Sequence, residues 1–311
     1  MTDVIIIGAG LAGLNAARNL EKSGKTVLVL EARSRLGGRN LAQVLEDGNV
    51  LEMGGQWIGP SQTRIYELCK ELELELYPTY NEGKNLFYLN GKRKPMKPKK
   101  DALPPFNVFE LLDLDRIVKK IRKMTAEIDL KEPWKHPKAK EWDQHTYETW
   151  IQCNPLTART KEFLRIFAEA VFSAESADFS FLHFLFYVKA GVDIETLSSV
   201  DRGAQQERVI GGTQLISKRI AASLKNEVEL NCPIDRIEQN ENGITVYSGK
   251  KSWSAKKVIV AIPPTLAGRI SYEPPMPPNR DQLTQRIPMG TVIKIQVLYK
   301  TPFWRKEGWT G

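Results

Sequence analysis

The hydrophobic pattern opens with a short apolar run, a glycine-rich turn and an amphipathic stretch. Residues 4–7 form a β-branched run bounded by glycine, which predicts a strand buried on both faces. Apolar residues then recur at helical spacing over residues 11–20, and Gly24 follows as a stop signal. Residues 26–30 are strand-like again. The N-terminal pattern therefore predicts a βαβ unit.

Three glycines and one acidic residue in this unit indicate that it binds a nucleotide. Gly8, Gly10 and Gly13 have the GxGxxG spacing, in which they permit a tight turn, close approach of a pyrophosphate and packing of helix on strand. The free N–H groups and the dipole at the helix start favour phosphate. Glu31 ends the second strand, where a carboxylate can accept from both ribose hydroxyls and repels a 2′-phosphate. We expect a dinucleotide cofactor other than an NADP type, whereas the alternative is a plain glycine turn of an α/β protein.

The middle of the chain is helical and rich in aromatic residues. An Asn90-Gly91 pair between apolar runs predicts a hairpin over residues 85–94. The helical period predicts helices over residues 108–124, 146–152, 157–172 and 180–190. The last of these helices carries apolar side chains that we interpret mainly as core: Phe181, Phe184, Leu185, Phe186 and Val188. This change of composition predicts a second domain inserted into the first.

The last third of the chain returns to short strands. Strands are expected over residues 207–210, 228–230, 243–247, 251–254 and 257–261, with another beginning at residues 233–234 and a helix over 213–224. Residues 291–299 alternate as a strand that places Lys294 and Gln296 on one face, Ile293 and Ile295 on the other. From the residues alone, a lysine there is expected to reach water at a sheet edge.

Length, charge and cysteine usage narrow the class of protein. The 311 residues predict about two domains, and no apolar run reaches the ~18 residues of a membrane span. The net charge of +8 is concentrated over residues 84–100 and 131–140, which predicts a solvated rim rather than a site for an anionic partner. No nucleic-acid motif accompanies it. Isolated Cys69, Cys153 and Cys232 and the absence of a secretion signal predict a soluble, cytoplasmic protein without disulfides or a metal site.

Further motifs carry a resemblance to a known family. The stretch EARSRLGGRN over residues 31–40 resembles the EAR-x-R-x-GGR motif of the flavin-containing amine oxidase family, which includes monoamine oxidases. The GGQW of residues 54–57, the QER of residues 206–208 and the AIPPTLAGRI of residues 261–270 continue the resemblance. Arg33 and Arg39 can meet a pyrophosphate through charge-assisted hydrogen bonds. The resemblance implies FAD as the cofactor.

The resemblance also implies the fold and the site residues. It implies a glutathione-reductase-type, doubly wound FAD domain over residues 1–80 and 207–265, and an inserted, largely helical substrate domain of α+β type over 81–206 and 266–311. Gln206 would project toward the substrate. Lys294 would contact flavin N5 through a water, which replaces the interpretation of Lys294 as a residue that reaches solvent at a sheet edge. His183 receives no role. The residues expected at the cofactor are Gly8, Gly10, Ala12, Gly13, Glu31, Ala32, Arg33, Gly38, Arg39, Gly54, Gly55, Gln56, Trp57 and Ile234.

The implied activity is oxidative deamination of a small-molecule amine: hydride transfer from its α-carbon to flavin N5, hydrolysis of the imine, and reoxidation by O₂ to hydrogen peroxide. The resemblance stops at Gly311 without the family's C-terminal region. We therefore expect a truncated chain that holds FAD poorly alone and is completed by a C-terminal polypeptide or by homo-oligomer formation. The alternatives are a related oxidase or desaturase acting on L-amino acids, carotenoids or porphyrinogens, and a non-catalytic remnant. The GGR sequence of residues 37–39 makes an NAD-dependent dehydrogenase the least favoured alternative.

Overall fold

The computed structural model describes residues 2–89, 91–96 and 103–311, which divide into two compact units. The sheet unit comprises Met1–Gln56, Ile65–Leu76 and Val209–Met289. The helical unit comprises Trp57–Arg64, Tyr77–Arg208 and Gly290–Gly311. Residues 266–289, expected with the inserted domain, lie in the sheet unit instead. The reason is that β12 (Ser271–Glu273) extends the main sheet, while α11 (Pro278–Arg286) packs on α10 (Pro264–Ala267).

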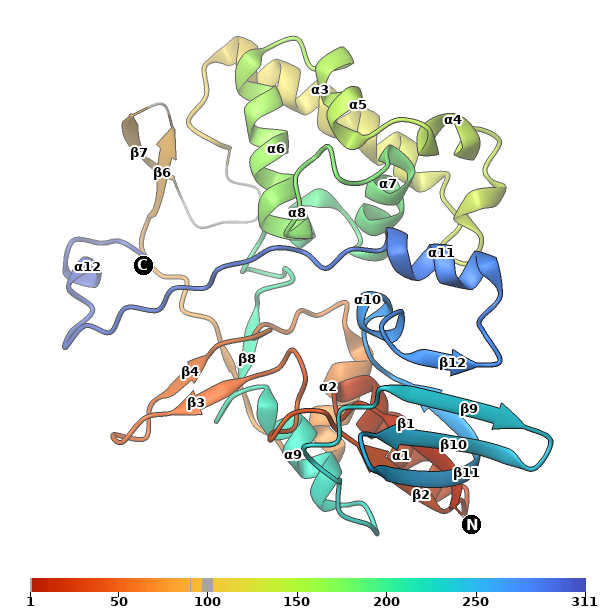
Figure 1. Ribbon diagram of the computed structural model, residues 1–311. Coiled ribbons are helices and arrows are strands. Elements are labelled where there is room, and N and C mark those ends of the chain that lie inside the picture. Colours follow the sequence, from red (N-terminus) through yellow and green to blue (C-terminus); the bar gives the residue numbers. More distant parts are fainter. Residues whose placement is uncertain (1, 90, 97–102) are drawn as a thin grey trace. The chain divides into compact units, whose positions relative to one another are not determined.

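The sheet unit is built on six strands in the order β12-β9-β10-β11-β1-β2 (Figure 1). β1 (Thr2–Ile7) lies between β2 and β11 and runs parallel to both. The remaining bounds are β2 Val27–Leu30, β9 Arg236–Asn240, β10 Gly243–Ser248 and β11 Lys251–Val260. The two strands expected over residues 251–261 are thus one continuous strand. The strand expected over 228–230 is wrong, because Glu229 makes only an isolated bridge to Leu30.

Helices and short strands complete the sheet unit. α1 (Leu11–Lys22) buries Gly13, Leu14 and Ala17, which is the predicted stripe. Its Arg18 pairs with Glu71, 2.6 Å away, on α2. The other elements of this unit are α2 Thr63–Glu71, which begins in residues of the helical unit, α9 Gln214–Ala222, and the hairpin β3 Ala42–Val44 with β4 Val50–Glu52. β5 (Leu76–Pro78) pairs with β8 (Glu207–Val209), and most residues of these two strands belong to the helical unit. The β3–β4 hairpin was not expected from the sequence.

Polar caps fix where the helices of the helical unit begin. Asn107 forms a capping box with Glu110, and the side chains of Thr146, Thr157 and Ser180 each accept from a backbone N–H of the helix that follows. The helices are α3 Val108–Ala126, η1 Pro133–Lys135, α4 Ala139–Asp143, α5 Tyr147–Cys153, α6 Ala158–Phe172, α7 Phe181–Ala190 and α8 Ile194–Leu197. The four expected helices are confirmed.

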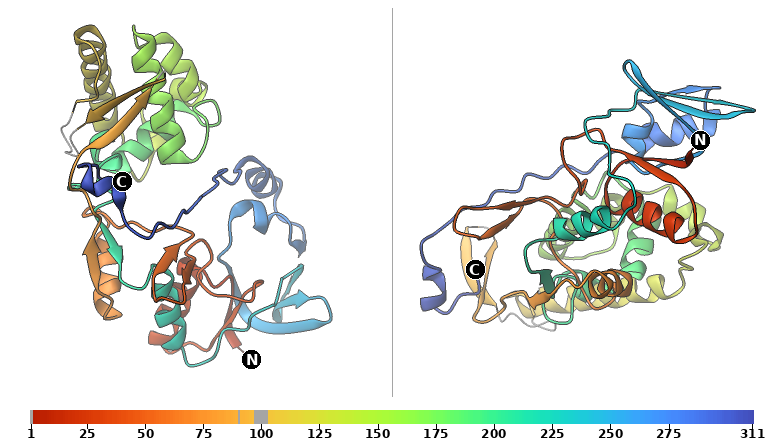
Figure 2. Two further views of the ribbon diagram at one scale, coloured as in Figure 1. Left: turned by 90° about the vertical axis from the view of Figure 1, so that its left-hand side faces the viewer. Right: turned by 90° about the horizontal axis from the view of Figure 1, so that it is seen from below.

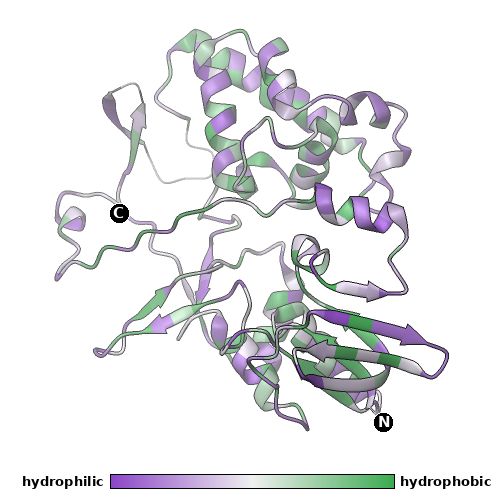
Figure 3. Ribbon diagram, in the orientation of Figure 1, coloured by the Kyte–Doolittle hydropathy of each residue, from purple (hydrophilic) through white to green (hydrophobic). Residues whose placement is uncertain are grey.

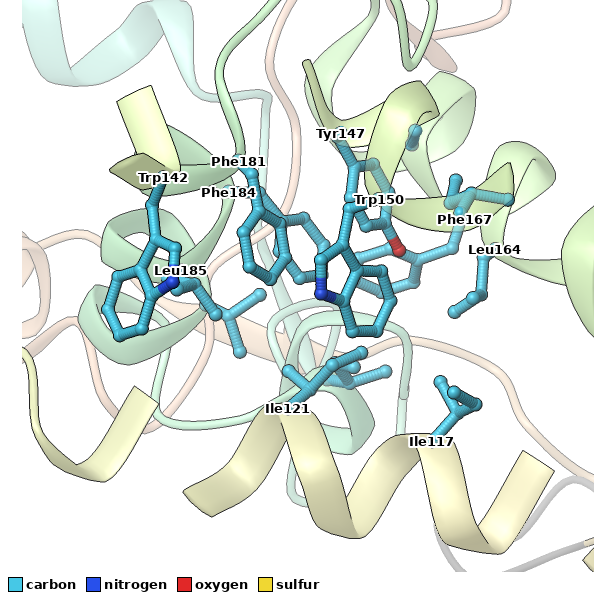
Figure 4. Packing of buried hydrophobic residues seen from close by; sticks show 14 of the residues in the cluster. Ile117, Ile121, Trp142, Tyr147, Trp150, Leu164, Phe167, Phe181, Phe184 and Leu185 are labelled. Carbon is cyan, nitrogen blue, oxygen red and sulfur yellow. The ribbon is translucent and has the colours of Figure 1, made fainter. Parts of the chain in front are cut away.

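The core of the helical unit is aromatic. The rings of Tyr147 and Phe184 stack with centroids 3.8 Å apart, and Trp150 stacks on Phe181 at 4.7 Å (Figure 4). Ile117 and Ile121 of α3 point into the same cluster. Four of the five apolar residues singled out on α7 are buried there, and Phe186 packs against the cluster. Their interpretation as core is confirmed.

The expected hairpin is present, whereas the expected strand over residues 291–299 is wrong. β6 (Asn85–Leu89) pairs antiparallel with β7 (Lys92–Met96); Asn90 of the predicted turn lies outside the described residues. After α11 the chain runs extended to α12 (Phe303–Lys306) without helix or strand, as Figures 1 and 2 show in dark blue. Within the described part of the chain, no strand pairs with this segment. Alternation alone does not make a strand.

Candidate cofactor site

The turn between β1 and α1 requires glycine at two positions for reasons of packing. Gly8 has a φ of +105°, and a Cβ there would lie 2.7 Å from Ile262 Cγ2. A Cβ on Gly13 would lie 2.0 Å from the carbonyl oxygen of Gly8. Neither position tolerates a side chain without movement of the backbone. The turn is therefore as tight as the GxGxxG spacing predicts.

Gly10 is different, because the space beside it is open. The nearest heavy atom to a Cβ built there is Gly38 Cα, 3.9 Å away. Gly10 is the N-cap of α1, it gives no side-chain cap, and the first turn of α1 has no acidic residue. The first N–H groups of a helix have no partner within the helix, and their dipole attracts anions. This geometry fits a phosphate group.

Glu31 lies beside the turn and is buried, with 7% exposure. Its Oε2 accepts from the backbone N–H of Ala9 at 2.8 Å, and its Oε1 accepts from that of Arg33 at 3.0 Å. A carboxylate offers about four acceptor positions, so capacity remains for ribose hydroxyls. Glu31 thus fixes the turn and also presents acceptors.

The loop after β2 is held by its own arginines and by a distant segment. Arg35 donates to the carbonyl oxygen of Gly38 at 3.0 Å, and the exposed Arg33 does so at 3.4 Å. The backbone N–H groups of Asn231 and Cys232 donate to the carbonyl oxygens of Arg33 and Glu31, at 3.1 and 2.9 Å. These contacts bring the segment leading to Ile234 beside the loop. Ala32 and Arg39 are exposed on it.

Gly54 and Gly55 are placed by two residues that the sequence did not single out. A Cβ on Gly54 would lie 2.0 Å from the Arg39 carbonyl oxygen, so glycine is required there. The Thr213 hydroxyl donates to the Gly55 carbonyl oxygen at 2.6 Å, and buried Glu52 accepts from the Thr213 N–H at 2.8 Å. Only tertiary contact reveals this pair, because residues 52 and 213 are 161 positions apart. The pair holds the turn that ends in half-buried Gln56.

Three of the expected site residues belong to the helical unit. Trp57 has 48% of its surface exposed, which is unusual for a tryptophan. Gln206 lines a cavity of about 870 Å³ together with Thr79, Tyr80 and Glu82. Lys294 is half-buried on the extended segment. His183 packs among aromatic rings, and burial lowers its pKa, which is consistent with a structural residue.

Comparison with known proteins places the chain among flavoenzymes. The model of the family "Flavin containing amine oxidoreductase" matches residues 11–311. The chain is 40% identical over 311 residues to the probable flavin-containing monoamine oxidase A of Dictyostelium discoideum, covering 99% of this chain and 68% of that protein. It is 37% identical over 313 residues to the flavin-containing amine oxidase A of Sus scrofa, covering 100% of this chain and 59% of that protein.

Two solved structures of similar proteins have the same fold. Putrescine oxidase bound to putrescine superposes with a TM-score of 0.93 at 35% identity, covering 100% of this chain and 69% of that one. Cyclohexylamine oxidase from Brevibacterium oxydans gives a TM-score of 0.93 at 32% identity, covering 99% and 68%. The chain therefore spans only part of each of these relatives.

The residues of the sheet unit fit the cofactor that these comparisons indicate. The open space at Gly10 and the N–H groups of α1 suit the pyrophosphate of FAD, and the free acceptors of Glu31 suit a ribose. FAD is the cofactor of this class of protein, and the expected α/β fold is confirmed. With residues 11–311 matched by the family model, the chain belongs to the flavin-containing amine oxidoreductase family.

Proposed function

We propose that the protein serves in the FAD-dependent oxidative deamination of amines. The observation that carries this proposal is the dinucleotide cradle of the sheet unit in a chain of this family. Bound FAD supplies the acceptor for the hydride equivalent from the amine α-carbon. Reaction with O₂ reoxidises the flavin and yields hydrogen peroxide. The chain spans 59% to 68% of the length of its curated relatives, so the activity of a whole enzyme is part of the proposal.

The proposed roles of the residues follow from their places in each unit. The sheet unit would bind FAD: the glycine turn and α1 receive the pyrophosphate, Glu31 orients the ribose, and residues 54–56 approach the flavin ring. Exposed Arg33 and Arg39 would add charge-assisted hydrogen bonds to phosphate. The cavity beside Gln206 supports a substrate-binding role for the helical unit. Lys294 would act at flavin N5.

The similar proteins support a small aliphatic or cyclic amine as substrate, because two of them are named for putrescine and cyclohexylamine. We place the protein in the cytoplasm. The free thiols of Cys69, Cys153 and Cys232 are in keeping with a reducing compartment.

We further propose that a polypeptide equivalent to the unmatched part of the relatives completes the protein, in preference to a homo-oligomer. The extended segment supports this: Ile293 and Ile295 are 86% and 80% exposed, and Val297 and Leu298 are each 64% exposed. An extended, β-branched segment that pairs with no strand of the described residues is a suitable partner for an added strand. The uncovered length of the relatives supplies enough chain for one.

Anaerobic reduction of the bound flavin tests the function. The FAD-loaded chain is mixed with putrescine or cyclohexylamine under nitrogen, alone and together with the unmatched part of putrescine oxidase. We expect slow bleaching alone and rapid bleaching together. Bleaching by L-amino acids or porphyrinogens instead would indicate a related oxidase, and a colourless protein that takes up no FAD would indicate a non-catalytic remnant.

A further inference from the structure

A small cavity lies within the sheet unit, among α10, β12 and the start of α11, which Figure 1 labels. Its volume is about 350 Å³, near the lower end of the roughly 300–1,000 Å³ range of small-molecule sites. All of its lining residues lie between positions 267 and 284, so they belong to one unit. None of them is a residue expected at the cofactor or the substrate. We call this cavity the α11 pocket.

Most of the side chains that line the α11 pocket are apolar. Ala267 and Ile270 are buried, with 2% and 7% exposure, and Tyr272 is half-buried. Pro275 and Met276 line it from the exposed loop between β12 and α11. Proline has no backbone N–H to donate. This part of the pocket therefore suits an apolar group of a ligand.

Contacts within the chain fix the walls of the α11 pocket. The Tyr272 hydroxyl donates to the Ala267 carbonyl oxygen at 2.9 Å, and the hydroxyl of buried Thr284 donates to the Asp281 carbonyl oxygen at 2.8 Å. A Cβ on Gly268 would lie 2.8 Å from Thr284 Oγ1, so α10 and α11 are in close contact there. A pocket with fixed walls loses little freedom when a ligand binds.

Two opposite charges line the same pocket at the start of α11. Within the part of the chain that the structure describes, the exposed Arg280 guanidinium makes no hydrogen bond or ion pair. Burial raises the pKa of Tyr272 and the charge of Arg280 lowers it, which indicates that Arg280 lies near this ring. Asp281 Oδ2 accepts from Gln285 Nε2 at 2.9 Å. A carboxylate offers about four acceptor positions, so Asp281 can accept further hydrogen bonds.

The helix itself accounts for one of these charges but not for the other. The N-terminal end of a helix carries partial positive charge, which favours an acidic residue and disfavours a basic one. Asp281 is the acidic residue of the first turn of α11, whereas Arg280 is the third residue of the same helix. Arg280 therefore gains nothing from its place in α11, and an anionic group in the pocket would compensate its charge.

From this arrangement we infer that the α11 pocket binds a free α-amino acid with an apolar side chain. Arg280 receives the carboxylate through the paired hydrogen bonds that a guanidinium makes with it. Asp281 receives the ammonium group, and the side chain of the ligand contacts Ile270, Tyr272 and Met276. This inference does not depend on the proposed function.

The pair of charges favours a zwitterion over a ligand with one charge. A simple carboxylate would lie near Asp281, and a simple amine would lie near Arg280, so each would meet a like charge in the pocket. An α-amino acid carries both charges on neighbouring atoms and has no net charge. It therefore complements both residues at once.

Calorimetric titration of the full chain with L-leucine tests the inference, with and without FAD. We expect saturable binding with a dissociation constant on the order of 0.1 to 1 mM, as for a ligand of this size. Three further probes each lack one feature of L-leucine: glycine the apolar side chain, isocaproate the ammonium group and isoamylamine the carboxylate. Each should bind roughly tenfold or more weakly to the α11 pocket.

Matched variants show whether the binding occurs in the α11 pocket. Arg280→Gln and Asp281→Asn should each weaken L-leucine binding roughly tenfold or more. Arg286→Gln, at the other end of α11, and Glu241→Gln should not, since both residues are exposed and neither lines the pocket. Isoamylamine binding is taken as the difference between wild type and Asp281→Asn, because an amine at the flavin binds both equally. Circular dichroism checks that each variant is folded.

Three results would overturn the inference. Wild type that does not bind L-leucine would show that the α11 pocket is not a site for amino acids. L-leucine binding that Arg280→Gln and Asp281→Asn leave unchanged would place the ligand elsewhere on the chain. Isocaproate that binds as tightly as L-leucine would show that a single carboxylate is sufficient.

Discussion

Two apolar, β-branched runs of this protein differ in structure: one is a buried strand and the other is an extended segment with exposed side chains. β1, with the sequence TDVIII, lies between two parallel strands, and its Ile5 and Ile6 are fully buried. Residues 291–299, with the sequence TVIKIQVLY, have at least as strong a strand pattern and remain an exposed extended chain. Figure 3 shows hydrophobic colouring along parts of both. The difference lies in the partners that each run has, not in its composition.

The chain is nevertheless attached within the helical unit at the start of the extended segment and again after α12. The N–H of Thr291 donates to the Ser173 carbonyl oxygen at 3.1 Å, and the N–H of Thr310 donates to that of Lys84 at 3.1 Å. A Cβ on Gly290 would lie 3.0 Å from the Ser173 carbonyl oxygen, so the chain enters in close contact. This part of the chain is therefore attached to the helical unit on both sides of the extended segment.

The largest expected effect compares one isoleucine from each run. Ile6→Ala should destabilise the protein by about 2 to 5 kcal/mol, because it leaves a cavity in a paired and covered strand. Ile295→Ala should change stability by at most about 0.5 kcal/mol, as expected for an exposed position. Urea unfolding of both variants, followed by circular dichroism, checks the difference. Equal losses would mean that residues 291–299 are covered in solution.

A second prediction concerns pH and the polar network of the helical unit. Hydrogen bonds from Arg165 lower the pKa of Glu148 most, and hydrogen bonds from Ser176 and Gln152 lower it further. Burial raises this pKa by less, so that it lies at about 2. The folded-state pKa lies below the ordinary value, so this carboxylate stabilises the fold above about pH 4.5 and loses that effect as the pH falls toward 2.

Glu148→Gln should therefore cost about 1 to 3 kcal/mol at neutral pH and should flatten the loss of stability in acid. Thermal unfolding between neutral and acid pH measures both effects. The exposed Glu241→Gln is the matched control. A variant with the wild-type acid dependence would show that the network contributes nothing to folding.

The smallest expected effect on binding is that of Lys294→Met. In the chain supplemented with a polypeptide equivalent to the unmatched part of its relatives, this change should alter FAD affinity by at most about 0.5 kcal/mol. It should slow reoxidation of the reduced flavin by O₂, since a cation near N5 stabilises the charge that O₂ acquires. Stopped-flow reoxidation measures this effect, with the exposed Lys300→Met as control. Reoxidation at the wild-type rate, or an experimental structure with the Lys294 ammonium in bulk water, would contradict the assignment.

Local signals predicted much of the fold. The β1–α1–β2 unit and the four helices with polar caps follow from periodicity and from glycine, serine, threonine and asparagine at their boundaries. The position of Glu31 at the end of β2 was predictable because it follows the apolar run directly. The Glu52–Thr213 pair was not predictable, because its residues lie 161 positions apart. The β3–β4 hairpin was not predictable either, because strands of three residues carry little periodic signal. That residues 291–299 join no strand of the described part of the chain depends on which elements lie beside them and not on their own alternation.

The affinity of the chain for FAD tests the central claim, that the glycine turn and Glu31 bind the cofactor. Fluorescence titration of wild type and Glu31→Ala should show roughly 10- to 150-fold weaker binding in the variant, about 1.5 to 3 kcal/mol for hydrogen bonds to a buried carboxylate. Glu31→Gln, which keeps one acceptor oxygen, should be intermediate, and exposed Glu46→Ala should match wild type. Unchanged affinity in a folded Glu31→Ala would contradict the account and exclude Glu31 from the cofactor site.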